Sequence, residues 1–426
     1  MRLVSPFVFA ALAILAARPA LGAKKILYAT EGTPGRIAGY CLNADGSLAS
    51  NASFRFELRD GLDPTKTFPR RVLIDPRVRP GAPNGVAYVV ETDRVEVFRI
   101  GNTGFLKRIG TTKPVDEMRT LDVAVSENGS FLYVPQSGRN RIVAYPLDPN
   151  DGSIAGEPTS CIQGALPSRY QRIRAANGLV YVVTTDHSAR IEVFKPAADG
   201  SLPAKYPDEC KAAPVGGTRP PVTNPVVTGG STRKKLTVPK PFAIGMIGGV
   251  PYAYVDERGS HKISGFRLDP ATACNPVDAT LGVGNFCPPV AVKPNGKKKM
   301  FQKRDSRTGS LVLYEDLIFY GNTLLAANFG KGRIDAFLIP TDGPHAGRLP
   351  KVPTVSSAQD IRMSPVHLTA DDDVLYVATG ALDAITAYRL RRDGLLVDRT
   401  PFSRTGEETD SFPNDVAVAS LPEQCQ

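Results

Sequence analysis

The 426-residue sequence lacks the short motifs that mark several common enzyme classes. It contains no G-x-S-x-G, no H-E-x-x-H and no Walker-type loop, so a serine hydrolase, a zinc protease or a nucleotidase has no motif support. None of its six cysteines stands in a C-x-x-C pair, which removes the usual signals of thiol redox chemistry and covalent haem. Tryptophan is absent, and there are only four histidines.

Long apolar runs are also missing, apart from a short one at the start. Residues 1–23, MRLVSPFVFAALAILAARPALGA, combine a basic residue, an apolar run from Phe7 to Ala17 and small residues up to Ala23. Such a run is too short to cross a bilayer but suits a signal peptide; a buried strand or a retained anchor is the alternative. We therefore expect a secreted or periplasmic protein without a membrane span, and six cysteines suit that oxidising location.

What the sequence has in abundance is turn residues and one repeated hairpin. Gly (39) and Pro (37) are scattered along the chain, and residues 133–154 read YVPQSGRNRIVAYPLDPNDGSI. Related hairpins begin 45 to 73 residues apart, at Tyr28, Tyr88, Tyr181, Tyr254, Leu325 and Tyr376. An apolar strand precedes each hairpin except the first, whose missing strand is found at residues 413–420. The pattern predicts an all-β, seven-bladed β-propeller over residues 24–426, closed when the C-terminal segment supplies the inner strand of the first blade.

A family resemblance follows from the same repeat. The run DVAVSENGSFLYVPQSGRNRIVAYPLDPNDGSI resembles the blade of the seven-bladed lactonase-like propellers, which include 6-phosphogluconolactonase, carboxymuconate cyclase and the YVTN-repeat surface proteins. WD40 and quinoprotein propellers match poorly, since tryptophan is absent. The resemblance implies a lactone hydrolase or cycloisomerase, and His367 in SPVHLTADDD matches a histidine that often precedes the inner strand in this family. The third blade departs from the pattern, with Arg119 and Thr120 at its inner-strand entry and QSG where the family tends to have an acidic loop.

The propeller topology places several titratable residues on one face. Loops between the second and third strands of each blade, and loops that lead into the inner strand, emerge on the same side, which we call the top face. The candidate catalytic residues there are His187, His261, His367 and Glu257, and the candidate ligand-binding residues are Arg71, Arg94, Arg119, Arg139, Arg190 and Arg258. A histidine would act as general base on water, while arginines would hold a substrate carboxylate and stabilise the oxyanion. Alternatively, the histidines are ordinary turn residues bonded to neighbouring loops. A zinc site would need three of these groups to converge at about 2 Å from one ion, which spacing alone does not show, and we expect neither a metal nor a cofactor.

The positive charge of the chain indicates what kind of partner it binds. The formal net charge is +10, and two basic insertions near residues 216–240 and 293–309 lie on the predicted top face. A cationic mouth attracts anions, although a solvated basic loop is the alternative. The secretory signal and the lack of an aromatic-studded basic groove argue against nucleic acid. We expect a monomer that binds a small anionic ligand, a protein or a surface polymer on this face without lactonase chemistry; the alternative is a hydrolase or cycloisomerase acting on a small anionic lactone.

The six cysteines suggest three pairs. Cys274 and Cys287 flank one insertion and can close it locally. Cys41 ends the third strand of the first blade and Cys425 follows its C-terminal inner strand, so this pair can clasp the ring. Cys161 and Cys210 remain, on the outer strands of neighbouring blades.

Overall fold

The computed structural model describes residues 25–32, 35–58, 69–113, 121–139, 141–163, 168–186, 190–205, 239–257, 262–267, 313–350, 352–360, 364–405, 412–423 and 425. The predicted signal peptide lies outside these residues, as do the two basic insertions apart from residues 239–240.

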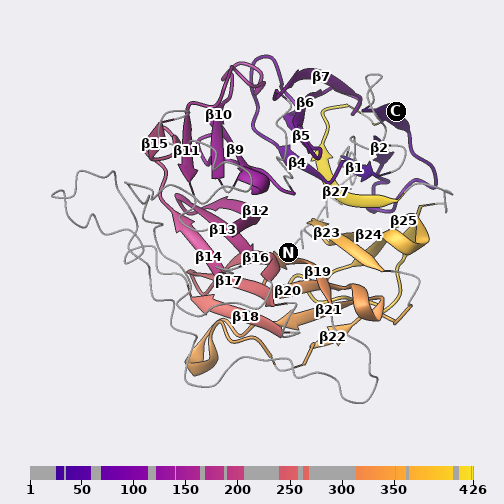
Figure 1. Ribbon diagram of the computed structural model, residues 1–426. Coiled ribbons are helices and arrows are strands. Elements are labelled where there is room, and N and C mark those ends of the chain that lie inside the picture. Colours follow the sequence, from indigo (N-terminus) through magenta and orange to yellow (C-terminus); the bar gives the residue numbers. More distant parts are fainter. Residues whose placement is uncertain are drawn as a thin grey trace, which may run out of the picture.

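The strands of the described residues form seven antiparallel sheets around a central axis (Figure 1). From the inner strand outward, the first three are β27(Pro413–Ser420)-β1(Lys25–Glu31)-β2(Arg36–Cys41)-β3(Phe54–Glu57), then β4(Arg71–Asp75)-β5(Val86–Val90)-β6(Val95–Ile100)-β7(Leu106–Thr111), then β8(Ala124–Val125)-β9(Phe131–Gln136)-β10(Arg141–Pro146)-β11(Ser160–Gln163). The next two are β12(Ser168–Ala176)-β13(Leu179–Asp186)-β14(Arg190–Phe194) and β16(Pro239–Ile247)-β17(Val250–Glu257)-β18(Lys262–Arg267). The last two are β19(Tyr314–Tyr320)-β20(Thr323–Asn328)-β21(Arg333–Leu338)-β22(Val355–Ser356) and β23(Pro365–Asp371)-β24(Val374–Thr379)-β25(Ala384–Arg389)-β26(Ser403–Arg404). The predicted all-β propeller is confirmed.

One short strand pairs differently from the hairpin repeat. β15 (Ala204–Lys205) follows the turn after β14, and the repeat predicts that it should extend the sheet of β14. It pairs instead with β11 of the preceding sheet, through Ser160 and Cys161. The backbone N–H of Leu202 donates to the Ser160 hydroxyl at 2.8 Å, which holds the segment against β11.

The two ends of the described chain meet in one sheet. β27 pairs with β1 in antiparallel register, from Lys25 opposite Ser420 to Thr30 opposite Asp415. Beside this pairing, Cys41 and Cys425 form a disulfide that joins residues 384 positions apart. This predicted pair is confirmed. Cys161 is also disulfide-bonded, and Cys210, Cys274 and Cys287 lie outside the described residues.

A repeated tyrosine holds neighbouring sheets together. In five sheets the buried tyrosine that opens the hairpin donates its hydroxyl to a glycine carbonyl in a turn of the next sheet. These hydrogen bonds are Tyr28–Gly104 (2.7 Å), Tyr88–Gly152 (2.9 Å), Tyr133–Gly200 (2.6 Å), Tyr254–Gly347 (2.6 Å) and Tyr376–Gly46 (2.9 Å). All five glycines have positive φ, for example +90° at Gly200, a conformation that side chains with a Cβ disfavour. The recurrence of Tyr and Gly along the sequence is therefore a contact between sheets as well as a turn signal.

The hydrophobic core lies between adjacent sheets. One cluster joins the first sheet to the second through Ile26, Tyr28, Val89 and Phe98, and similar clusters fill the other interfaces. Within the described part of the chain, the helices are too short and too polar to span a membrane. The inner strands β4, β12, β16, β19, β23 and β27 surround the central axis and position the site described next.

Candidate functional site

One position near the start of each inner strand carries the site. It is the residue directly before the apolar run, and acidic and basic residue types alternate there around the axis except in β16, where Pro241 occupies it. From the first sheet onward, the acidic and basic residues at this position are Asp415, Arg71, Asp122, Arg172, Asp316 and His367.

The three acidic residues connect adjacent sheets. Each carboxylate accepts the backbone N–H of the residue after the basic group in the next sheet. These contacts are Asp415 from Val72 (2.7 Å), Asp122 from Ile173 (3.2 Å) and Asp316 from Leu368 (3.0 Å). The three carboxylates are almost completely buried. They therefore serve as links between sheets, and they also place negative charge beside the basic residues.

His367 lies at the centre of this arrangement. Its Nδ1 contacts Asp415, while its Nε2 lies 3.1 Å from Nη1 of Arg71 and 3.2 Å from Oδ2 of Asp316. Because the Asp415 carboxylate lies beside Nδ1, a neutral ring that carries its proton there turns the lone pair of Nε2 toward Arg71. If the ring is protonated, its Nε2–H faces Asp316. The imidazole is thus held between two carboxylates, with a guanidinium at one nitrogen.

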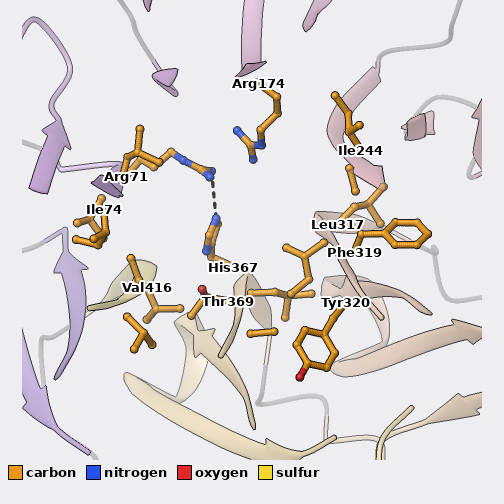
Figure 2. Close-up of a pocket in the computed structure, with 18 of the residues that line it drawn as sticks. Arg71, Ile74, Arg174, Ile244, Leu317, Phe319, Tyr320, His367, Thr369 and Val416 are labelled. Carbon is orange, nitrogen blue, oxygen red and sulfur yellow. Dashed lines mark hydrogen bonds between the residues drawn. The ribbon is translucent and has the colours of Figure 1, made fainter. Parts of the chain in front are cut away.

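Two arginines complete the charged end. Arg71 forms an ion pair with Asp122, with Nε 2.6 Å from Oδ1, and Arg174 donates from Nη1 to the other oxygen of Asp122. Figure 2 shows Arg71, Arg174 and His367 projecting toward one another from three different strands. This part of the site has both signs of charge within hydrogen-bonding distance, so it is a compensated cluster.

The surrounding charges determine the ionisation of the buried acids. Burial alone raises the pKa of Asp415, but the charges of His367 and Arg71 and the Val72 N–H more than offset it, so the pKa lies below its ordinary value. Burial likewise opposes ionisation of Asp122, and Arg174 and Arg71 lower its pKa in turn. Both acids are therefore carboxylates at neutral pH.

The charged cluster opens onto a cavity of about 510 Å³ along the central axis. Arg71, Arg174 and His367 line one end, and apolar residues such as Ile74, Ile244, Leu317 and Phe319 line the rest (Figure 2). Cavities of this size commonly hold small molecules, with a few polar groups fixing their orientation. The geometry therefore suits a compact ligand with one polar end.

The predicted site residues have separate outcomes. The structure brings His367 and Arg71 together at the cavity. Arg94 pairs instead with Glu91 (3.5 Å) and Asp93 (3.3 Å) in its own hairpin. Arg139 lies in the short helix η1 (Ser137–Arg139), and neither Arg94 nor Arg139 lines the cavity.

The remaining candidates stay predictions. Arg190 and Glu257 belong to strands β14 and β17, but their side chains lie outside the described part of the structure. His187, His261, Arg119 and Arg258 lie outside the described residues altogether. Over the residues that are described, no group of histidine, cysteine or acidic side chains has the arrangement of a metal site.

Sequence reasoning missed Asp122, Asp316 and Arg174 as parts of the site. The sequence does carry a signal for the two acids, because several inner strands share one pattern, a charged or titratable residue followed directly by an apolar run. The matching segments are DVAV at 122–125 and again at 415–418, DLIF at 316–319, RVLI at 71–74 and HLTA at 367–370. Aligning the strands on the residue before the apolar run would have grouped these charges. Arg174 carries no such signal, since it lies two residues further along its strand.

Comparison with known proteins supports the fold. The model of the lactonase family, described as a seven-bladed β-propeller, matches residues 36–206. The lactonase resemblance is confirmed. The lactonase-like propeller also superposes on the periplasmic gluconolactonase of Pseudomonas aeruginosa, with a TM-score of 0.59, 14% identity, and 93% of this chain and 99% of that chain covered. For a candidate 6-phosphogluconolactonase of Bacteroides fragilis the TM-score is 0.60 at 14% identity, and 93% of this chain and 98% of that chain are covered. For a protein from Lactobacillus plantarum the TM-score is 0.60 at 15% identity, and 93% of this chain and 99% of that chain are covered. At these identities the structures show a shared fold only. No curated protein matches the sequence of this lactonase-like propeller.

Proposed function

We propose that this chain is an extracytoplasmic propeller that hydrolyses a small lactone at the charged end of its central cavity. One observation carries the proposal: His367 is held by Asp415 at Nδ1, and its Nε2 meets Arg71 where the cavity ends. The family match over residues 36–206 supports a lactone as the substrate class. The Cys41–Cys425 disulfide and the N-terminal apolar segment support a location outside the cytoplasm.

The same proposal includes the architecture. The seven sheets are the seven blades of one ring, and β27 closes that ring by completing the first blade. The pairing of β27 with β1 supports this, as does the Tyr376 hydroxyl, which bonds the last sheet to the first at Gly46. Closure places Asp415, from the C-terminal strand, beside His367 of the seventh sheet. The proposed site therefore depends on the closed ring.

The chemistry uses the neutral form of His367. The carbonyl oxygen of the lactone accepts the N–H of Arg71, which frees Nε2 for a water molecule. Nε2 takes a proton from that water as its oxygen bonds to the carbonyl carbon, and the positive charges of Arg71 and Arg174 stabilise the oxyanion. The ring C–O bond then breaks, and Nε2–H returns the proton to the departing oxygen. The product is a hydroxycarboxylic acid.

The two carboxylates have distinct roles in this step. Asp415 holds the proton on Nδ1 and so fixes the tautomer in which Nε2 is the base. Asp316, 3.2 Å from Nε2, joins Asp415 in stabilising the imidazolium that forms when the water is deprotonated. Without Asp316 the Nε2–H of the imidazolium would face Arg71 alone, which is a repulsive contact.

A second candidate is ligand binding without turnover. It is favoured by the partners that already occupy both His367 nitrogens and by the 8% exposure of its side chain. This is close to the function favoured from sequence, but the place differs. Arg71 and Arg94 are both paired with acids, which leaves them poorly suited to bind a polyanion on the top face. The cavity is therefore the better place for a ligand, and its size suits a small one.

Hydrolysis of a lactone panel by the purified protein and by the His367→Asn variant tests the proposal. We expect the wild type to hydrolyse at least one lactone and the variant to lose roughly a hundredfold or more in kcat/KM. The matched control is His345→Asn, which changes an exposed histidine in the short helix η5 (Gly343–His345), away from the cavity. Asp415→Asn should change the pH profile, because an amide no longer enforces the Nδ1–H tautomer.

The outcomes separate the two candidates. Full activity in His367→Asn would overturn the hydrolytic role of this residue. Lactone binding without hydrolysis by the wild type, measured by calorimetry, would favour binding without turnover. A thermal unfolding curve for each variant establishes whether lost activity reflects lost folding.

A further inference from the structure

The side chains that line the cavity are mostly apolar away from His367. Beyond the charged end its wall consists of apolar side chains from several inner strands, among them Leu73, Ile74, Ile244, Ile318, Phe319 and Val418. In the described lining, Thr369 and Tyr320 are the neutral polar side chains, and both lie on strands next to one another, β23 and β19. The apolar wall therefore surrounds the axis from β4 through β16 and β19 to β27.

This wall is matched to a particular kind of ligand. A sugar lactone carries a hydroxyl on most carbons, and hydroxyls that face the apolar side chains of this wall would lose water without gaining partners from them. An alkyl substituent gains free energy from the same burial, in proportion to the area removed from water. Apolar side chains along the wall therefore favour an apolar substituent by contact.

We infer that the substrate is a lactone with an apolar substituent, which lies along the cavity while the ester carbonyl meets Arg71 and His367. This inference rests on the proposed function and specifies its substrate class. The cavity of about 510 Å³ accommodates a ring together with a chain of several carbons, within the size range of small-molecule sites. The charged end orients the ester, and the apolar wall selects the substituent.

A series of γ-lactones tests this inference directly. The series runs from unsubstituted γ-butyrolactone to γ-lactones with alkyl chains of increasing length, with D-glucono-1,5-lactone as the polyhydroxylated comparison. We expect kcat/KM to rise by about fourfold for each methylene until the cavity is filled. We expect gluconolactone to be hydrolysed more slowly than the longest alkyl lactone that fits.

Substitutions in the cavity wall test whether its side chains cause the preference for long-chain lactones. Ile244→Asn places an amide in the apolar wall and should reduce the ratio of long-chain to short-chain kcat/KM by at least about tenfold. Val397→Asn, at a residue that is 54% exposed and away from the cavity, is the matched control and should leave that ratio unchanged. Thermal unfolding of both variants shows whether each is folded. If Ile244→Asn does not fold, Ile74→Asn takes its place in the same comparison.

The outcomes distinguish the inference from the function on which it rests. A flat or falling series, or a preference for gluconolactone, overturns the apolar-substituent inference and leaves lactone hydrolysis standing. If no lactone is hydrolysed, the proposed function fails, and calorimetry with decanoate as the probe decides the inference. Decanoate binding that is weakened by Ile244→Asn supports an apolar ligand in the cavity, and absence of binding overturns it.

Discussion

The buried acids of this propeller differ in the partners around them. Asp122 and Asp415 accept backbone N–H groups and contact arginine or histidine, which lowers the pKa of each. Glu91 is also fully buried, but over the described residues neither of its carboxylate oxygens has a hydrogen bond. Its cation, Arg94, lies 3.5 Å away, at an ion-pair distance without hydrogen-bond geometry. Burial and the nearby Glu96 raise the pKa of Glu91 to about 8.

The raised pKa of Glu91 makes a prediction about stability and pH. A folded-state pKa of about 8, against an ordinary value of 4.5, means that the folded protein binds this proton more tightly than the unfolded chain. The free energy of unfolding should therefore fall as pH rises from about 4.5 to about 8, by a few kcal/mol from this group. Glu91→Gln should remove that part of the fall and be more stable than the wild type at pH 8.5.

Urea unfolding at pH 5 and pH 8.5 measures this difference. The control is Glu57→Gln, which changes an exposed glutamate on strand β3 and should follow the wild type at both pH values. An identical loss of stability in Glu91→Gln and in the wild type would show that Glu91 is solvated in the folded protein.

At the scale of the strand and hairpin, the sequence predicts what is local. Alternating apolar residues and glycine turns predicted the hairpins, because both signals act within a few residues. The charges of the inner strands were found only in part, since His367 takes its partners from strands β4, β19 and β27. Such pairs depend on which strands become neighbours around the axis. The pairing of β15 with β11 was not predicted for the same reason, because it depends on a contact with Ser160, which belongs to another sheet.

The tyrosine that opens each hairpin has a measurable effect on stability. Tyr133 is fully buried and donates to the carbonyl of Gly200 at 2.6 Å, so Tyr133→Phe leaves that carbonyl without this partner. We expect a loss of about 1 kcal/mol in the free energy of unfolding, measured by urea denaturation. Tyr320→Phe is the control, because among the described residues its hydroxyl has no hydrogen bond, and it should change stability little. Equal stability of both variants would mean that the Tyr–Gly hydrogen bond contributes nothing beyond packing.

At the scale of the whole molecule, the first and last strands determine whether the site exists. Asp415 belongs to β27, close to the C-terminus, yet it contacts His367 and accepts the N–H of Val72. Detachment of β27 would remove an acid from both neighbours at once and expose the edge of β1. Structural integrity and the proposed chemistry therefore depend on the same strand.

The Cys41–Cys425 disulfide should stabilise this arrangement mainly by restricting the unfolded chain. It closes a loop with a sequence separation of 384, and a cross-link over so long a loop removes much of the freedom of the unfolded state. The Cys41→Ser/Cys425→Ser double variant should fold, because the pairing of β27 with β1 remains, but lose roughly 2–5 kcal/mol in the free energy of unfolding. Urea unfolding without reductant should show a lower midpoint and a larger m-value, since the unfolded variant exposes more surface.

Reductant provides the control for that comparison. It should lower the midpoint of the wild type more than that of the double variant, in which only disulfides such as that of Cys161 remain to be broken. Equal midpoints for the wild type and the double variant would show that strand pairing alone holds the ends together.

Lactone hydrolysis by the folded double variant tests the dependence of the site on β27, because activity should be lost at the urea concentration where β27 detaches. In the wild type, where the disulfide ties the segment after β27 to the end of β2, activity should persist to a higher concentration.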